Sequence, residues 1–371
     1  MNSIFITLIS IHFSLIKSDV LSFQENLFKT ILQEEKGNNI LISPMSIYEI
    51  LTLTSNGAAE ETLEEMLKVL IPYKNIDNEI QNTLNLNLID IIDKITPNNN
   101  SLQINIPSLN QCKGDCEVTF ENANGIFVKK GYSILNEFSL ICNNYKTEFS
   151  ELESVAQVNN WINKKTNKKI PSFLPNDYDI TNVNLMLVNA IYFKGSWLNG
   201  FDEKTEKRDF KNFDGVKIQV DTMKHLFKDI YYYEDEKIQM ISLPYQSTNL
   251  IYKMVIILPR DNKYSSSYDY LNKENVNFTK LISKLKKVDR VQLYLPKFEF
   301  DYNIQLNEVL KKMGMEKPFS SEEANFSKIS KSKLFIDDIL HQSKITVDQK
   351  GTVAVAITTF EIHEFSNNLM K

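Results

Sequence analysis

One stretch of the chain is apolar on both of its alternating faces, and it constrains the fold more than any other feature. Residues 184–193 read NLMLVNAIYF. Successive side chains of a strand point to opposite faces, so a strand that is apolar on both must be covered on both. We therefore expect a central strand in a sheet with both faces buried. Residues 253–259 and 291–296 are shorter strand-like runs, and each ends in Leu-Pro.

Helical periodicity dominates the first half of the chain, and strand-like patterns dominate the second. Apolar residues recur at helical spacing and predict helices in five regions. These regions are residues 23–32 (ended by Gly37), 46–70 (interrupted at 57–59), 75–94, 155–165 and 306–313. Helices first and strands later, without a regular strand–helix–strand alternation, indicate an α+β fold. Nothing marks a linker, so we expect a single domain over residues 19–371.

The composition is that of a globular protein and argues against some partners. Apolar residues make up 42% and charged residues 24% of the 371 positions, and the formal net charge is −5. Lys and Arg are spread along the chain, whereas a nucleic-acid-binding protein concentrates them on one face. We expect neither a nucleic acid nor a membrane partner, and a monomer.

Three cysteines leave the disulfide question open. Cys112 and Cys116 lie in a polar loop and are able to close a small ring in a secreted protein, while Cys142 is expected to be a buried thiol. The C-x3-C spacing has no histidine pair nearby and is poor for zinc, so we expect no metal and no cofactor.

The first eighteen residues predict a secretory signal. Residues 4–16 are almost all apolar, too short to span a bilayer comfortably, and Ser18 is a possible cleavage point. The expected location is therefore extracellular, and Asn99, Asn277 and Asn325 would then be glycan acceptors. The alternative is a buried N-terminal helix in a cytoplasmic protein.

Enzyme signatures are missing from the sequence. There are only four histidines, and no nucleophile elbow, phosphate-binding loop, dinucleotide-binding turn or zinc-protease helix is found. We therefore do not expect an enzyme.

Several motifs spread over nearly the whole chain resemble those of the serpin family, in the family's order. They are residues 39–47 (NILISPMSI), 57–59 (GAA) with Thr62, 187–197 (LVNAIYFKGSW), 295–298 (LPKF), 324–329 (ANFSKI), 340–344 (LHQSK) and 348–352 (DQKGT). The resemblance implies a fold of three β-sheets and about nine helices, with an exposed reactive-centre loop after Gly351.

The sequence of that loop agrees with the function that the resemblance implies. In a strand, one face would present small residues and the other β-branched residues, there is no proline through Phe365, and no charge precedes Glu361. Such a segment is suited to become a buried central strand. The hinge comprises Gly351, Thr352, Val353, Ala354, Val355, Ala356, Ile357 and Thr358.

The resemblance implies a suicide inhibitor of serine proteases. The protease would cut the loop and form an acyl-enzyme, and the cut loop would then insert into the main sheet and distort the trapped protease. Family spacing from Gly351 places the reactive bond between Phe365 and Ser366, which suits a chymotrypsin-like protease of the chymase or cathepsin G type. A small difference in loop length would move the bond to Leu369, Met370 or Lys371, and Lys371 would favour trypsin-like targets.

Other residues match the family's structural control points. Ser43, Ser46, Asn189 and His341 match the shutter, the polar cluster beneath the place where strands part. Trp197, Lys297 and Gln349 match the breach, where the loop first inserts. No residue is assigned a catalytic role.

The chain departs from the family pattern in ways that favour an alternative function. Gln349 replaces the usual acidic partner of Lys297, while Val353, Val355 and Ile357 are bulkier than usual. Serpin chains also continue past the reactive bond and supply two strands of the second sheet, which a chain ending at Lys371 lacks. The alternative is a non-inhibitory serpin that acts as a carrier, a chaperone or a protease decoy.

Overall fold

The structure is a computed structural model that describes residues 5–9, 18–72, 118–166, 168, 174–247, 252–260, 263–274 and 276–356. The helices in these ranges are α1 (Ser18–Glu34), α2 (Pro44–Ser55), α3 (Glu60–Leu70), α5 (Asn136–Asn144), α6 (Val155–Lys165), α7 (Ser267–Lys273), α8 (Phe278–Ile282), α9 (Asn307–Lys312) and the 3-10 helix η1 (Lys317–Phe319). The strands are β1 (Phe5–Ile9), β2 (Thr119–Lys129), β3 (Glu148–Leu152), β4 (Leu185–Ser196), β5 (Glu206–Lys211), β6 (Lys217–Glu234), β7 (Ile238–Pro244), β8 (Lys253–Pro259), β9 (Lys286–Pro296), β10 (Phe298–Gln305), β11 (Asp338–Val347) and β12 (Gly351–Ala356).

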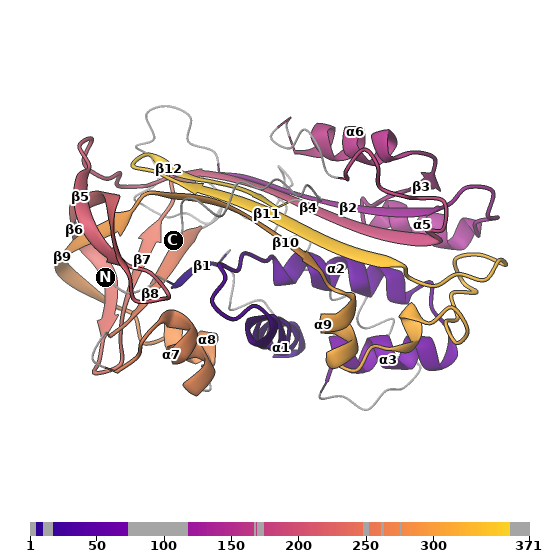
Figure 1. Ribbon diagram of the computed structural model, residues 1–371, viewed down its shortest axis with the longest axis horizontal. Helices are drawn as coiled ribbons and strands as arrows, with labels where there is room; N and C mark the ends of the chain where they lie inside the picture. Colours follow the sequence, from indigo (N-terminus) through magenta and orange to yellow (C-terminus); the bar gives the residue numbers. More distant parts are fainter. Residues whose placement is uncertain are drawn as a thin grey trace.

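The main sheet has six strands in the order β10-β11-β12-β4-β2-β3, with β4 inside it. Leu185 and Leu187 of β4 pack into the core formed with α1, α2 and α3, while Met186 and Val188 pack on the opposite face beneath α6. Figure 1 shows α2 on one side of this sheet and α6 on the other. The prediction of a central strand covered on both faces is confirmed.

Helix α2 supports the main sheet from below and is buried along nearly its whole length. Two of its polar side chains are satisfied within the helix, since the Thr54 hydroxyl donates to the Ile50 carbonyl at 2.7 Å and the Ser55 hydroxyl to the Thr52 carbonyl at 2.6 Å. Such local hydrogen bonds allow a helix rich in Ser and Thr to lie in a core.

The remaining strands are hydrogen-bonded as one set, β1-β8-β7-β6-β5 with β9 also on β6. The long strand β6 divides this set into two sheets, which with the main sheet makes three. It pairs with β5 and β9 over most of its length and with β7 at its end, and β7 continues through β8 to β1. The α+β fold with three sheets is therefore confirmed, with eight α-helices in the part of the chain that is described.

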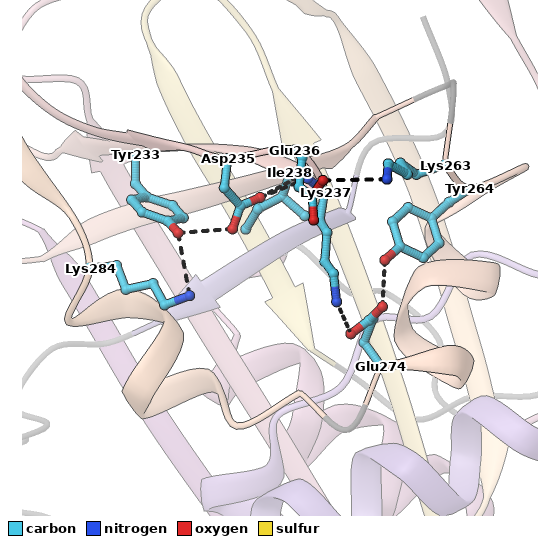
Figure 2. Close-up of polar contacts among 9 residues, drawn as sticks. All are labelled: Tyr233, Asp235, Glu236, Lys237, Ile238, Lys263, Tyr264, Glu274 and Lys284. Atoms are coloured by element: carbon cyan, nitrogen blue, oxygen red, sulfur yellow. Dashed lines mark hydrogen bonds and ion pairs between the residues drawn. The ribbon is translucent and has the colours of Figure 1, made fainter.

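A polar network joins α7 to the turn between β6 and β7 (Figure 2). Glu274, just after α7, accepts the Lys237 ammonium at 2.8 Å and the Tyr264 hydroxyl at 2.5 Å. Asp235 caps the turn by accepting the backbone N–H groups of Lys237 and Ile238. The network is half-exposed and is best explained as a brace that holds α7 against β7 and β8.

Several predicted segments agree with the structure, and others lie outside it. Residues 155–165 form α6 and residues 253–259 form β8, as predicted. The helix expected over residues 75–94 and the Cys112–Cys116 pair lie outside the described residues. Part of the predicted signal, Phe5–Ile9, pairs as strand β1 with the edge of β8.

Candidate functional site

The candidate site is the place where β12 lies within the main sheet, between β11 and β4 (Figure 1). Its register with β4 runs from Gly351 opposite Ser196 to Ala356 opposite Ile191, and both pairings are antiparallel. The resemblance implied an exposed loop after Gly351, but Gly351 and the five residues after it form a central strand. The reason is their composition, since a small, uncharged and β-branched segment pairs well on both sides.

Ile357, Thr358, Phe365 and Ser366 lie outside the described residues, so the predicted reactive bond stays a prediction. Val353, Ala354, Val355 and Ala356 are placed by their backbone pairing in β12.

The turn that leads into β12 is held by its own carboxylate and by Trp197. The Asp348 carboxylate accepts the backbone N–H groups of Lys350 at 2.8 Å and Gly351 at 3.1 Å. Trp197 donates its backbone N–H to the Lys350 carbonyl at 2.9 Å and its indole N–H to the Asp348 carbonyl at 3.0 Å. Trp197 therefore lies beside the turn that precedes Gly351.

Two glycines allow β12 to approach β4 closely. A Cβ atom on Gly351 would lie 2.2 Å from the Gly195 carbonyl oxygen, and one on Gly195 would lie 2.8 Å from the ring of Tyr245. Both positions therefore exclude a side chain unless the backbone or the ring moves. Tyr245 was missed by the sequence analysis, because a tyrosine at the end of a strand carries no signal of its own.

Below β12 the main sheet is closed. Strands β11 and β4 pair directly and in parallel there, with Asp338, Ile339 and Leu340 opposite Met186, Leu187 and Val188. In the same register, a loop that continued β12 would meet the first of these direct pairs, Leu340 with Val188, at residue 359 and would have to separate the strands from there on.

The four predicted shutter residues lie around this closed region. The backbone N–H of Ser43 donates to His341 Nε2 at 3.3 Å, and the Ser46 hydroxyl donates to the Ser43 carbonyl at 3.0 Å. The Asn189 amide donates to the Asn124 side chain at 2.7 Å. His341 is fully buried, and burial lowers its pKa to about 4, so the ring is neutral near pH 7. Asn124 is the partner that the sequence analysis missed.

The two other breach residues lie near the turn but do not share a described contact. The Gln349 amide donates to the Glu203 carbonyl at 3.3 Å, and the side chain of Lys297 is exposed while its backbone N–H donates to the Asp221 carbonyl at 2.8 Å. The Gln349 side chain therefore contacts the loop after β4.

Cys142 is buried and unpaired, and burial raises the pKa of its thiol to about 12, so the prediction of a buried thiol is confirmed. Within the described ranges, no group of three His, Cys, Asp or Glu side chains is arranged to hold a metal ion. No described helix is long and apolar enough to cross a membrane.

The fold and the site together define a class of protein whose main sheet takes up a segment from near the end of its own chain. A sequence profile described as "Serpin (serine protease inhibitor)" matches residues 19–370. The chain belongs to the serpin family.

The similar proteins cover most of the chain. An uncharacterised serpin-like protein of Methanosarcina mazei is 29% identical over 91% of this chain and 75% of its own length. Human plasminogen activator inhibitor 2 is 29% identical over 91% of this chain and 88% of its own length. The crystal structure of the thermophilic serpin tengpin in the latent state superposes with a TM-score of 0.75 at 27% identity, covering 94% of this chain and 90% of that one.

Proposed function

We propose that this serpin inhibits a serine protease of the chymotrypsin-like type by acting as a suicide substrate. The observation that supports the proposal is β12, a segment of small and β-branched residues paired on both sides within the main sheet. A sheet that accepts the first six residues of the loop as a central strand offers a direct route for the rest of the loop. Among its relatives, human plasminogen activator inhibitor 2 is named as an inhibitor.

The free energy for trapping would come from extending β12, as the loop residues after Ala356 insert between β11 and β4. Each new ladder hydrogen bond contributes about 1 kcal/mol, and each apolar side chain that becomes buried adds roughly 1.5–3 kcal/mol. Separating the three direct pairs between β11 and β4 opposes this gain. Nine further residues, 357–365, would therefore release on the order of 10 kcal/mol once a protease has cut the loop.

The proposed reactive bond lies between Phe365 and Ser366. An aromatic residue on the acyl side of the bond suits the deep apolar pocket of chymotrypsin-like proteases, such as chymase or cathepsin G. Cleavage after Leu369, Met370 or Lys371 is the competing assignment.

The experiment is to incubate the protein with chymotrypsin, cathepsin G and trypsin and to separate the products in SDS. We expect an SDS-resistant complex with the first two proteases, and mass spectrometry of the released peptide should place the cut after Phe365. The variant Phe365→Lys should transfer complex formation to trypsin, and Phe360→Lys is the matched control that should not. Cleavage without any complex would reject the inhibitory function and favour a carrier, chaperone or decoy.

We also propose that the protein is secreted as a monomer after removal of residues 1–18. The support is the apolar stretch at residues 4–16 and the position of the buried α1 side chains Phe23, Leu27 and Ile31, which all lie after the proposed cut. The N-terminus of the protein recovered from the culture medium of expressing cells should be Asp19. Retention inside the cell with Met1 intact would reject secretion.

A further inference from the structure

We propose that Tyr245 is the residue that seats the hinge, through a hydrogen bond to Thr352 that forms when the loop begins to enter the main sheet. This inference rests on the proposed loop insertion, because it assigns Tyr245 a positioning role in that step. Neither the motifs nor the resemblance pointed to this residue.

The hydrogen bond is buried and links segments that are far apart in the chain. The Tyr245 hydroxyl donates to the Thr352 hydroxyl oxygen at 2.8 Å across a separation of 107 residues. Thr352 is 1% exposed and Tyr245 is 4% exposed, so water has little access to either group. Burial raises the pKa of Tyr245, which keeps the phenol protonated and able to donate at any physiological pH.

The ring of Tyr245 is held by residues other than the hinge. It stacks on Trp197 with a centroid distance of 4.6 Å and an interplanar angle of 14°, and it meets Phe193 edge-on at 5.0 Å. The Tyr245 backbone N–H donates to the Tyr252 carbonyl at 2.9 Å. The hydroxyl is therefore positioned before Thr352 arrives.

The absence of a side chain at Gly195 lets the Tyr245 ring lie next to the hinge. Gly195 is the register partner of Thr352, and its missing side chain leaves the space that the Tyr245 ring fills. Asp348 and Trp197 hold the turn up to Gly351. Thr352 is therefore the first hinge residue that these turn contacts do not hold in the main sheet. If Thr352 left, the Tyr245 hydroxyl would lose the hydrogen bond described for it, and a buried polar group without a partner is costly.

The first test uses the uncut protein without any protease and measures amide hydrogen exchange. The variant Tyr245→Phe removes only the hydroxyl, and we expect the amides of residues 352–356 to exchange about 5- to 10-fold faster. Thr352→Val should have the same effect, the double variant should add nothing further, and Thr352→Ser should keep the slow exchange. Tyr252→Phe, in the same aromatic cluster, is the matched control and should leave these amides unchanged.

A purely structural role gives a different pattern. It would raise exchange in β7 and β8 together with β12 and lower the melting temperature, and the two substitutions would add. Unchanged exchange at residues 352–356 in Tyr245→Phe would overturn the proposal.

The second test measures partition with the protease that forms the complex. Tyr245→Phe should shift the products several-fold from the trapped complex toward the simply cleaved protein, while the rate of loop cleavage stays the same. If the wild-type protein forms no complex at all, the inhibitory function fails, whereas the exchange experiment still decides whether Tyr245 seats the hinge.

Discussion

The imidazole of His341 is fully buried beneath the main sheet, where it accepts the backbone N–H of Ser43. Burial lowers its pKa from 6.5 to about 4, so the folded protein resists protonating it. The unfolded chain binds that proton more readily, so stability is lost as the pH falls from 6.5 to 4 and is unaffected above that range. The loss amounts to about 3 kcal/mol once the pH is below 4.

The measurement is urea unfolding at several pH values between 7.5 and 4.5, for the wild type and for His341→Gln. Carboxylates also titrate at the acidic end, so the difference between the two proteins isolates the contribution of the histidine. The wild type should lose more stability than the variant on acidification. Parallel curves would show that His341 is protonated as easily in the fold as outside it.

A single carboxylate, that of Asp337, joins the closed lower parts of β4 and β11. It accepts the backbone N–H of Asn184 at 2.6 Å and that of Leu185 at 3.1 Å. Asp337→Ala would leave both donors without this partner, and we expect a loss of about 1–3 kcal/mol in urea unfolding. Asp177→Ala, at an exposed position, is the control and should change stability by less than about 0.5 kcal/mol.

At the scale of elements, β12 depends on a close backbone approach at its first residue. A Cβ atom on Gly351 would lie 2.2 Å from the Gly195 carbonyl oxygen and 3.0 Å from the Ser196 Cα atom, and neither backbone atom moves easily. We expect Gly351→Ala to cost about 1–3 kcal/mol and to displace the start of β12. Faster hydrogen exchange in residues 351–356 would report this displacement.

Gly200→Ala is the comparison for that substitution, because its Cβ would have its nearest neighbour, the Gln349 carbonyl oxygen, at 3.3 Å. Gly200→Ala places a methyl group beside the same turn, but at a position where the neighbouring atoms leave more space. An equal effect of the two substitutions would mean that the turn, and not the approach of β12 to β4, is the sensitive feature.

At the scale of the molecule, the main sheet has two parts. In the upper part β12 lies between β11 and β4, and in the lower part β11 and β4 pair directly. Under the proposed mechanism, cutting the loop would free residues 357–365 to follow β12 into the sheet. If insertion releases on the order of 10 kcal/mol, the melting temperature should rise by roughly 10 °C or more. Calorimetry before and after limited proteolysis at the loop measures the change, and an unchanged melting temperature would mean that the cut segment stays outside the sheet.

Which faces of the elements are buried can be predicted from the amino-acid pattern alone. The doubly apolar run at 184–193 predicted the covered central strand, and the uncharged run after Gly351 predicted a segment able to enter a sheet. Periodicity carries this information because it reflects only the distribution of apolar side chains along one element. The same logic placed α6 and β8 correctly.

How many hinge residues lie in the main sheet, and which side chains contact them, depends on contacts between distant segments. The hydrogen bond from Tyr245 to Thr352, the approach of Gly351 to Gly195 and the direct pairing of β11 with β4 each join segments distant in sequence. No local pattern encodes such contacts, because they depend on the relative placement of whole strands. That placement follows from packing the two faces of one sheet against different sets of helices.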